Sequence, residues 1–230
     1  MKLVLLPGLD GTGDLFARFV SQLPANIEPV VIRYPNQAWG YEQLLPFVKE
    51  QLPVNEPFAL LGESFSGPLA IMIAADQLPN FQALILACTF ARNPQIVALG
   101  LALKMRYLPP LFIQRLAVKY GLTHGIDSQS LEEEVLVAVQ KLSESTIWAR
   151  FEAIAHVNVL AQISKIQCPV LCLRATQDRL IPQSCVDDLT QHAKSLQVAT
   201  IQGPHCLLQS NPNRCVEEIT SFLNANVPNH

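Results

Sequence analysis

The chain has 230 residues, of which half are apolar and only 15% are charged, and its formal net charge is −3. This length supports one sizeable core with room for an inserted subdomain, and the composition favours a compact enzyme over a disordered protein. The missing basic run excludes the electrostatic footprint of a nucleic-acid binder. No stretch approaches the ~18 apolar residues of a membrane span, and the first apolar run is too short for a signal peptide. We therefore expect a cytoplasmic protein with no nucleic-acid or membrane partner.

The cysteines favour structural thiols over a metal site. No C-x-x-C pair occurs, and no spacing of cysteine and histidine fits zinc. The expectation is therefore free, buried thiols in a reducing compartment, with no metal and no cofactor. The six cysteines are Cys88, Cys168, Cys172, Cys185, Cys206 and Cys215.

Short apolar runs alternate with amphipathic segments along most of the chain. Fully apolar strands separated by helices predict a parallel sheet that is covered on both faces. The expected strands are 3–6, 29–32, 58–61, 84–88, 169–173 and 198–201, and the expected helices of this part include 14–22, 41–51 and 212–223.

The alternation is interrupted once. From Thr89 to about Lys165 the pattern contains no good strand, and four helical segments are expected at 96–105, 111–120, 130–142 and 145–160. This predicts a helical insertion into an α/β core. The expected organisation is a first core part over 1–90, a cap or lid over 91–165, and a second core part over 166–230.

Ser64 is the strongest candidate nucleophile. It stands in the GESFSG segment at 62–67, directly after the apolar strand 58–61 and before an apolar helix whose first turn contains Pro68. A serine on a sharp strand-to-helix turn has an exposed hydroxyl, and the N–H of the next residue points to the same place. The rival, Ser66, would lie inside the helix. The pattern also fits an ordinary strand–turn–helix, so the other parts of a catalytic site must decide.

An acid and a base follow the last two predicted strands. Asp178 lies in the loop after the strand 169–173, and His205 lies in the loop after the strand 198–201. The chain order serine, aspartate, histidine is the order of α/β-hydrolase triads, and the carboxyl ends of parallel strands meet at one edge of the sheet. The remaining histidines lie in the insertion, in a predicted helix or at the terminus: His124, His156, His192 and His230.

Two backbone N–H groups are expected to bind a tetrahedral oxyanion. The N–H of Phe65 is one by position, and that of Leu9 is the other, because Gly8 allows close approach of the loop after the first strand. A competing reading of this loop is a phosphate cradle at 11–13. It lacks the full glycine motif and the lysine that nucleotide binding needs.

Together these segments resemble an α/β-hydrolase fold enzyme of the small capped carboxylesterase type, which includes the pimeloyl-ester carboxylesterases. The segments are 5–12, 62–67, 166–171 leading to Asp178, and 203–205. The resemblance implies a reduced, mostly parallel six-stranded sheet with a helical lid formed by the insertion. Two residues depart from the family pattern: Pro7 stands where the family usually has histidine, and Ser66 where it usually has glycine, which would crowd the elbow.

The expected activity is hydrolysis of short- to medium-chain carboxylic esters through an acyl-enzyme on Ser64. One alternative is a thioesterase acting on acyl-carrier protein or CoA, or an acyltransferase; another is a non-catalytic binder of a small apolar ligand. Three cations of the insertion, Arg106, Arg115 and Lys119, fit either a solvated helix face or contact with an acidic partner such as a carrier protein.

Overall fold

The computed structural model describes residues 1–94, 117–124 and 129–227. Within them, six strands form one sheet in the order β2-β1-β3-β4-β5-β6, and every neighbouring pair is parallel. This confirms the expected sheet. The strands are β1 (Lys2–Leu6), β2 (Glu28–Val31), β3 (Phe58–Glu63), β4 (Phe81–Ala87), β5 (Val170–Ala175) and β6 (Leu196–Ile201).

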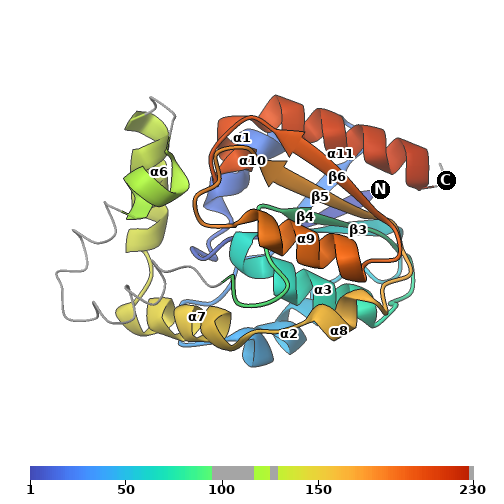
Figure 1. Cartoon of the computed structure of the whole chain (residues 1–230), viewed down its shortest axis with the longest axis horizontal. Coiled ribbons are helices and arrows are strands. Elements are labelled where there is room, and N and C mark those ends of the chain that lie inside the picture. The colour runs from blue at the N-terminus through green and yellow to red at the C-terminus, as the bar shows by residue number, and fades with distance from the viewer. Residues whose placement is uncertain (95–116, 125–128, 228–230) are drawn as a thin grey trace.

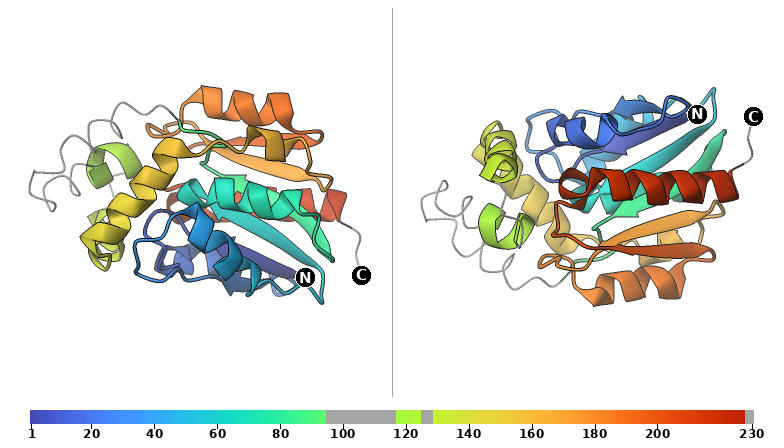
Figure 2. Two further views of the ribbon diagram at one scale, coloured as in Figure 1. Left: turned by 90° about the horizontal axis from the view of Figure 1, so that it is seen from below. Right: turned by 90° about the horizontal axis from the view of Figure 1, so that it is seen from above.

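Helices cover both faces of this sheet (Figures 1 and 2). One apolar cluster joins a sheet face to α2, α3, α8 and α9, and a second joins the opposite face to α1, α10 and α11. This two-sided burial explains why the inner strands are apolar at successive positions instead of alternating. The covering helices are α1 (Ala17–Val20), α2 (Tyr41–Lys49), α3 (Gly67–Ala75), α8 (Leu160–Ile163), α9 (Gln183–His192), α10 (Leu207–Ser210) and α11 (Pro212–Asn226).

Two described helices of the insertion, α6 (Gln129–Gln140) and α7 (Glu144–His156), lie beyond the carboxyl ends of the strands, on the side opposite the two chain ends (Figure 1). In the same insertion, Ala117–Leu122 form a π-helix, η3. The expected helix 96–105, and the 111–116 part of the expected helix 111–120, lie outside the described residues.

The expected helix 145–160 is wrong at its end. It stops at His156 because the next residues return to the core in an extended conformation. There the N–H of Val159 donates to the carbonyl of Ala91 at 2.7 Å, and Arg92 and Asn158 form an isolated antiparallel bridge. The two ends of the insertion are thus paired with each other.

The expected helix 14–22 is likewise shorter and irregular. It consists of a 3-10 turn, η1 (Asp14–Phe16), followed by the four residues of α1. Gly13 before it has φ 72°, so the loop enters the turn through a left-handed residue that the apolar pattern does not reveal.

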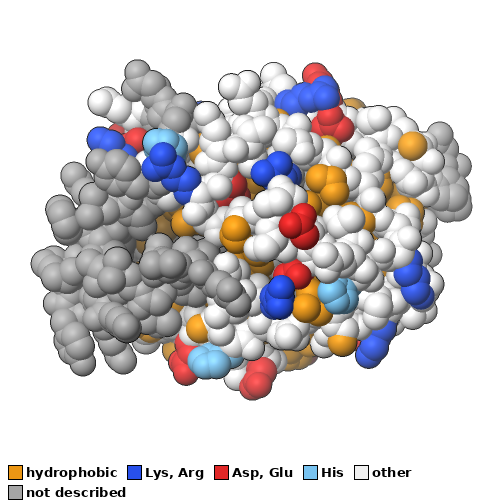
Figure 3. All heavy atoms as spheres, viewed as in Figure 1, with side chains coloured by type: hydrophobic (Ala, Val, Ile, Leu, Met, Phe, Trp, Pro, Cys, Tyr) orange, Lys and Arg blue, Asp and Glu red, His pale blue; other side chains and the backbone are white. Residues whose placement is uncertain are grey.

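No helix among the described residues is long and apolar enough to cross a bilayer. On the face of the molecule shown in Figure 3, basic and acidic side chains are interspersed rather than gathered by sign.

Candidate active site

Ser64 lies on the turn between β3 and α3, where the backbone takes an uncommon conformation. Its φ is 49°, in the left-handed region that non-glycine residues seldom occupy. From 58 to 71 it is the one residue that is not buried. A Cβ on Gly62 would lie 2.7 Å from the Cβ of Ala70, so glycine lets the strand and helix approach this closely. The turn therefore lifts the Ser64 hydroxyl clear of the core.

The structure brings Ser64, His205 and Asp178 into one hydrogen-bonded chain. Nε2 of His205 is 2.8 Å from Oγ of Ser64, and Nδ1 of His205 is 2.9 Å from Oδ2 of Asp178. The other oxygen of Asp178 accepts the N–H groups of Leu180 at 2.8 Å and Ile181 at 2.9 Å. Asp178 is therefore fixed by its own loop and faces the imidazole with one free oxygen.

Three strand ends supply these side chains. Ser64 follows β3, Asp178 follows β5 and His205 follows β6, and all three strands end at the same edge of the sheet. The strand between them, β4, is followed by Thr89, whose hydroxyl donates to the carbonyl of Ser64. Thr89 thus stabilises the turn through a hydrogen bond to its backbone. The sequence pattern does not predict this role.

Burial and charge act against each other at the histidine. Burial disfavours the imidazolium, but the Asp178 carboxylate and its hydrogen bond outweigh burial and raise the pKa of His205 above its usual 6.5. Burial likewise opposes ionisation of Asp178, yet His205 and the two loop N–H groups lower its pKa below 3.8. The pair is therefore arranged to stabilise a positive charge on His205, as a base that accepts a proton requires.

The loop 7–12, which we call the oxyanion loop after its expected role, lies directly against Ser64. A Cβ placed on Gly8 would be 3.8 Å from the Cβ of Ser64. The N–H of Leu9 donates to no acceptor within the described residues. Phe65, the other expected donor, follows Ser64 and is buried, with its carbonyl accepting the hydroxyl of Tyr41 at 2.7 Å.

Ser66 joins the elbow to the oxyanion loop. Its hydroxyl is fully buried, donates to the carbonyl of Pro7, and lies 2.6 Å from the hydroxyl of Tyr34. The residue that was expected to crowd the elbow therefore makes hydrogen bonds there. The sequence shows a serine in place of the family's glycine, but it does not show that Tyr34 and the loop would come within its reach.

Glu63 is a second acid next to Ser64, and the sequence pattern did not single it out. Its side chain is buried and accepts a hydrogen bond from Nε2 of Gln209 at 2.9 Å. Burial raises the pKa of Glu63 to about 7, and the hydrogen bond from Gln209 opposes this only in part. Its position next to Ser64 in the sequence is the only signal that could have pointed to it.

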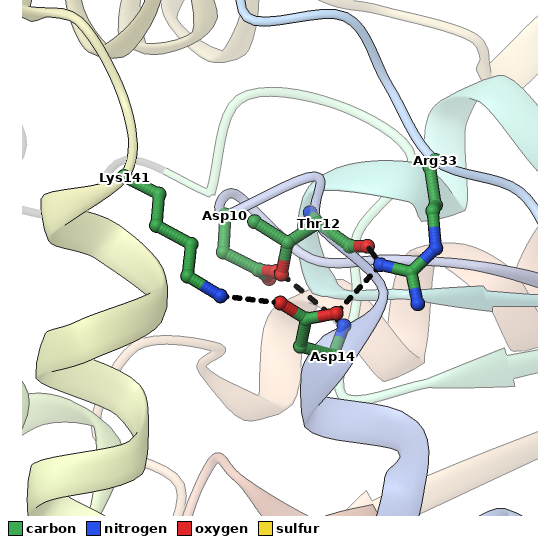
Figure 4. Close-up of polar contacts among 5 residues, drawn as sticks. All are labelled: Asp10, Thr12, Asp14, Arg33 and Lys141. Carbon is green, nitrogen blue, oxygen red and sulfur yellow. Dashed lines mark hydrogen bonds and ion pairs between the residues drawn. The ribbon is translucent and has the colours of Figure 1, made fainter.

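A cluster of charges ties the oxyanion loop to the insertion through Arg33, whose Nη1 donates to the carbonyl of Thr12 (Figure 4). Asp14 accepts Nη1 of Arg33 at 2.6 Å and Nζ of Lys141, just after α6, at 2.7 Å. One oxygen of Asp10 accepts both the N–H of Thr12 at 2.9 Å and its hydroxyl at 2.6 Å. Because the Thr12 N–H is used and two carboxylates flank the loop, this is a poor cradle for phosphate.

The described residues contain no cluster of three or more His, Cys, Asp or Glu side chains that could hold a metal ion. All six cysteines are free, and five of them are buried. The site is therefore built from a serine, a histidine, an aspartate and backbone groups, which suits acyl transfer.

A family model described as "Serine aminopeptidase, S33" matches residues 41–207, well over half of the chain and all three residues of the hydrogen-bonded chain. The chain belongs to this family of α/β hydrolases. Among solved structures, a hydrolase from Oleispira antarctica has a TM-score of 0.84 at 14% identity, covering 98% of this chain and 91% of that chain. At this identity the likeness concerns the fold.

Two curated relatives are similar over nearly the whole chain. The pimeloyl-[acyl-carrier protein] methyl ester esterase of Xylella fastidiosa (strain M12) is 24% identical over 241 residues, covering 96% of this chain and 94% of that protein. The AMB antimetabolite synthetase AmbE of Pseudomonas aeruginosa is 24% identical over 244 residues. That match covers 97% of this chain but spans only 10% of the length of AmbE.

Proposed function

We propose that this hydrolase cleaves short- to medium-chain carboxylic esters through an acyl-enzyme on Ser64. The observation that carries the proposal is the chain of contacts from Ser64 Oγ to His205 Nε2, 2.8 Å, and from His205 Nδ1 to Asp178, 2.9 Å. At these distances Nε2 of a neutral histidine can take the hydroxyl proton, while the aspartate keeps the other ring proton on Nδ1.

Acylation begins when Ser64 Oγ attacks the carbonyl carbon and its proton passes to Nε2 of His205. The oxyanion that forms is bound by the N–H groups of Leu9 and Phe65. When the tetrahedral intermediate collapses, the bond to the leaving oxygen breaks, and the alcohol leaves with the proton from His205. Asp178 stabilises the imidazolium throughout this step, in keeping with the raised pKa of His205.

Deacylation repeats the steps with water as the nucleophile. His205 takes a proton from water, the hydroxide oxygen attacks the acyl carbon, and Ser64 leaves with the proton from Nε2. The products are the alcohol, the carboxylic acid and free enzyme, so no cofactor or metal enters the balance.

A thioester is the second candidate substrate. The Xylella fastidiosa relative is named as a methyl ester esterase of a pimeloyl-[acyl-carrier protein], which favours an ester and makes an acyl-carrier protein a candidate partner here. Arg106 and Arg115, the cations expected to meet it, lie outside the described residues, whereas Lys119 on η3 is exposed. Charge reversal at the two arginines should weaken turnover of carrier-bound substrates in a salt-dependent way and leave neutral esters unchanged.

The insertion, residues 91–165, is proposed to act as a lid over the site. It connects the core parts 1–90 and 166–230. Pairing of Ala91 with Val159 supports the proposed start of the lid near residue 91. Helix α8, which follows this pairing, packs on the core. The proposed location of the chain is the cytoplasm, a reducing compartment in keeping with its free cysteines.

The proposal is tested with a panel of p-nitrophenyl esters and acyl thioesters. The wild type should hydrolyse part of the panel, and Ser64→Ala, Asp178→Asn and His205→Ala should each lose most of that activity while remaining folded. Ser21→Ala is the matched control, because Ser21 is exposed and its hydroxyl bonds only to its near neighbours Arg18 and Gln22. Equal turnover by Ser64→Ala and the wild type would rule out the proposed nucleophile. Tight retention of a ligand without turnover would favour a binding protein.

A further inference from the structure

Arg150 is the largest fully buried side chain of the described residues, and it comes from helix α7 of the insertion. Among those residues, no carboxylate lies within salt-bridge distance of it. Burial lowers the pKa of Arg150, and the nearby carboxylate of Asp10 opposes this effect. Arginine nevertheless stays charged in proteins, so burying it here is costly and calls for a compensating role.

The guanidinium holds backbone carbonyls instead of a carboxylate. Its Nη1 donates to the carbonyl of Leu9 at 2.6 Å, and its Nη2 donates to that of Pro35 at 3.3 Å. A Cβ on Gly11 would lie 2.5 Å from Nη1, and Gly11 has φ +67°, so the oxyanion loop is wrapped closely around this group.

The same guanidinium also contacts the second expected oxyanion donor. Its central carbon lies 5.9 Å from the ring centroid of Phe65 and 5.7 Å from that of Tyr34, within the range of cation–π attraction. One side chain thus touches both residues whose N–H groups are expected to bind the oxyanion, one at its carbonyl and one at its ring.

Helix α7 is itself fixed to the core, so Arg150 has a firm base. Oδ1 of Asn36 accepts the N–H of Ser143 and the hydroxyl of Thr146, both at 2.9 Å. Ser143 in turn caps the helix by accepting the N–H of Thr146 at 3.2 Å. The start of α7 is therefore bound to the loop that follows β2.

We propose that Arg150 is a positioning residue for the oxyanion hole: from the insertion, it fixes Leu9 and Phe65 so that both N–H groups meet the developing oxyanion. This inference rests on the proposed function. It gives the insertion a part in the chemical step, besides its expected role as a roof over the substrate. Fixing the Leu9 carbonyl restricts the backbone torsions of Leu9, and thereby the direction of its N–H.

The test compares Arg150→Met and Arg150→Lys with the wild type, using enzyme whose active sites are counted by complete reaction with an organophosphate. With Arg150→Met, kcat should fall by roughly 10- to 100-fold, KM should change little, and the Ki of a trifluoromethyl ketone should rise in parallel with the loss of kcat. Arg150→Lys should lie between, because an ammonium can reach one carbonyl but loses the fork.

Ile154→Ala is the matched control. Ile154 is buried one turn further along α7 and packs in the core, so its truncation loosens the same helix without touching the oxyanion loop. It should lower Tm yet keep kcat per active site close to wild type. If Arg150→Met keeps wild-type kcat per site, or if Ile154→Ala loses kcat to the same extent, Arg150 does not position the hole.

Should Arg150→Met fail to fold, Gly11→Ala is made in the wild type and in Arg150→Lys, because the added methyl displaces Nη1 while the left-handed φ of Gly11 strains the loop in both backgrounds. Gly11→Ala should lower kcat and weaken ketone binding by a smaller factor in Arg150→Lys than in the wild type; equal factors would overturn the inference. The proposed function fails separately, when the wild type hydrolyses nothing or Ser64→Ala equals it.

Discussion

Two carboxylates, Asp178 in contact with His205 and Glu63 near it, shift the pKa of His205 in the same direction. Burial lowers the pKa of His205, but Asp178 raises it more, and ionised Glu63 adds to the rise. The base must be neutral to accept a proton, so kcat/KM should fall at acid pH. The apparent pKa of this fall should be higher than 6.5. With a pKa of about 7, Glu63 is only partly ionised over this acid limb. Glu63→Gln removes that partial charge, so its acid limb should move slightly to lower pH than that of the wild type.

The measurement is kcat/KM from pH 5 to 9 for the wild type and Glu63→Gln, with one p-nitrophenyl ester under conditions where chemistry limits the rate. A flat wild-type profile would argue against a histidine base. An acid limb that moves upward in Glu63→Gln would show that the charge of Glu63 is not what His205 experiences.

Ser66→Ala should cost stability, because it leaves the Pro7 carbonyl and the Tyr34 hydroxyl without this partner in the core. A buried polar group left unsatisfied costs about 1–3 kcal/mol. Tyr34→Phe should cost less, since Ser66 then keeps Pro7 as its acceptor. Urea unfolding measures both, with the exposed Ser21→Ala as reference. If Ser66→Ala unfolds at the same urea concentration as Ser21→Ala, the hydrogen bonds of the Ser66 hydroxyl contribute nothing to stability.

Single residues were predictable from sequence only where position along a strand restricts them. Ser64, Asp178 and His205 each follow a predicted strand, and the edge of a parallel sheet brings such positions together. Arg150 and Glu63 escaped notice because their roles depend on partners far away in the chain. Leu9 and Arg150, for example, are separated by 141 positions.

At the scale of elements, the docking of α7 depends on one loop side chain. Asn36→Ala removes two acceptor contacts, to Ser143 and Thr146, and the donation to the carbonyl of Lys141 at 2.9 Å. Local opening of α7 should become more frequent, so its amides should exchange with deuterium faster, while those of β3 and β4 keep their rates. Gln22→Ala, on the opposite face, is the control. Unchanged exchange in α7 would mean that other contacts dock the helix.

The four inner strands, β1, β3, β4 and β5, were predictable because they are nearly continuous apolar runs that are buried along most of their length. The edge strands β2 and β6 are only partly buried and carry polar residues. The ends of the strands were less predictable. Strand β3 continues beyond the apolar run through Gly62 and Glu63, because its pairing in the sheet extends up to the turn at Ser64. The end of α7 at His156 was missed for a similar reason, since the pairing of Val159 with Ala91 joins distant segments.

At the scale of the whole molecule, the insertion is expected to roof a narrow apolar cleft over Ser64. Each buried methylene gains up to about 0.8 kcal/mol, roughly fourfold in kcat/KM when the gain is realised in the transition state. Activity on p-nitrophenyl esters should therefore climb from acetate towards butyrate or hexanoate, and fall when the acyl chain outgrows the cleft. If acetate or palmitate is the best ester of the series, the medium-chain cleft is wrong.

The central claim, an acyl-enzyme on Ser64, is tested most directly by trapping it. The wild type is mixed with p-nitrophenyl butyrate, quenched in acid during turnover, digested and analysed by mass spectrometry. We predict one butyryl group on the peptide that contains Ser64, absent from Ser64→Ala and lost as the ester is exhausted. A butyryl group on another residue during turnover, or undiminished turnover by Ser64→Ala, would contradict the account.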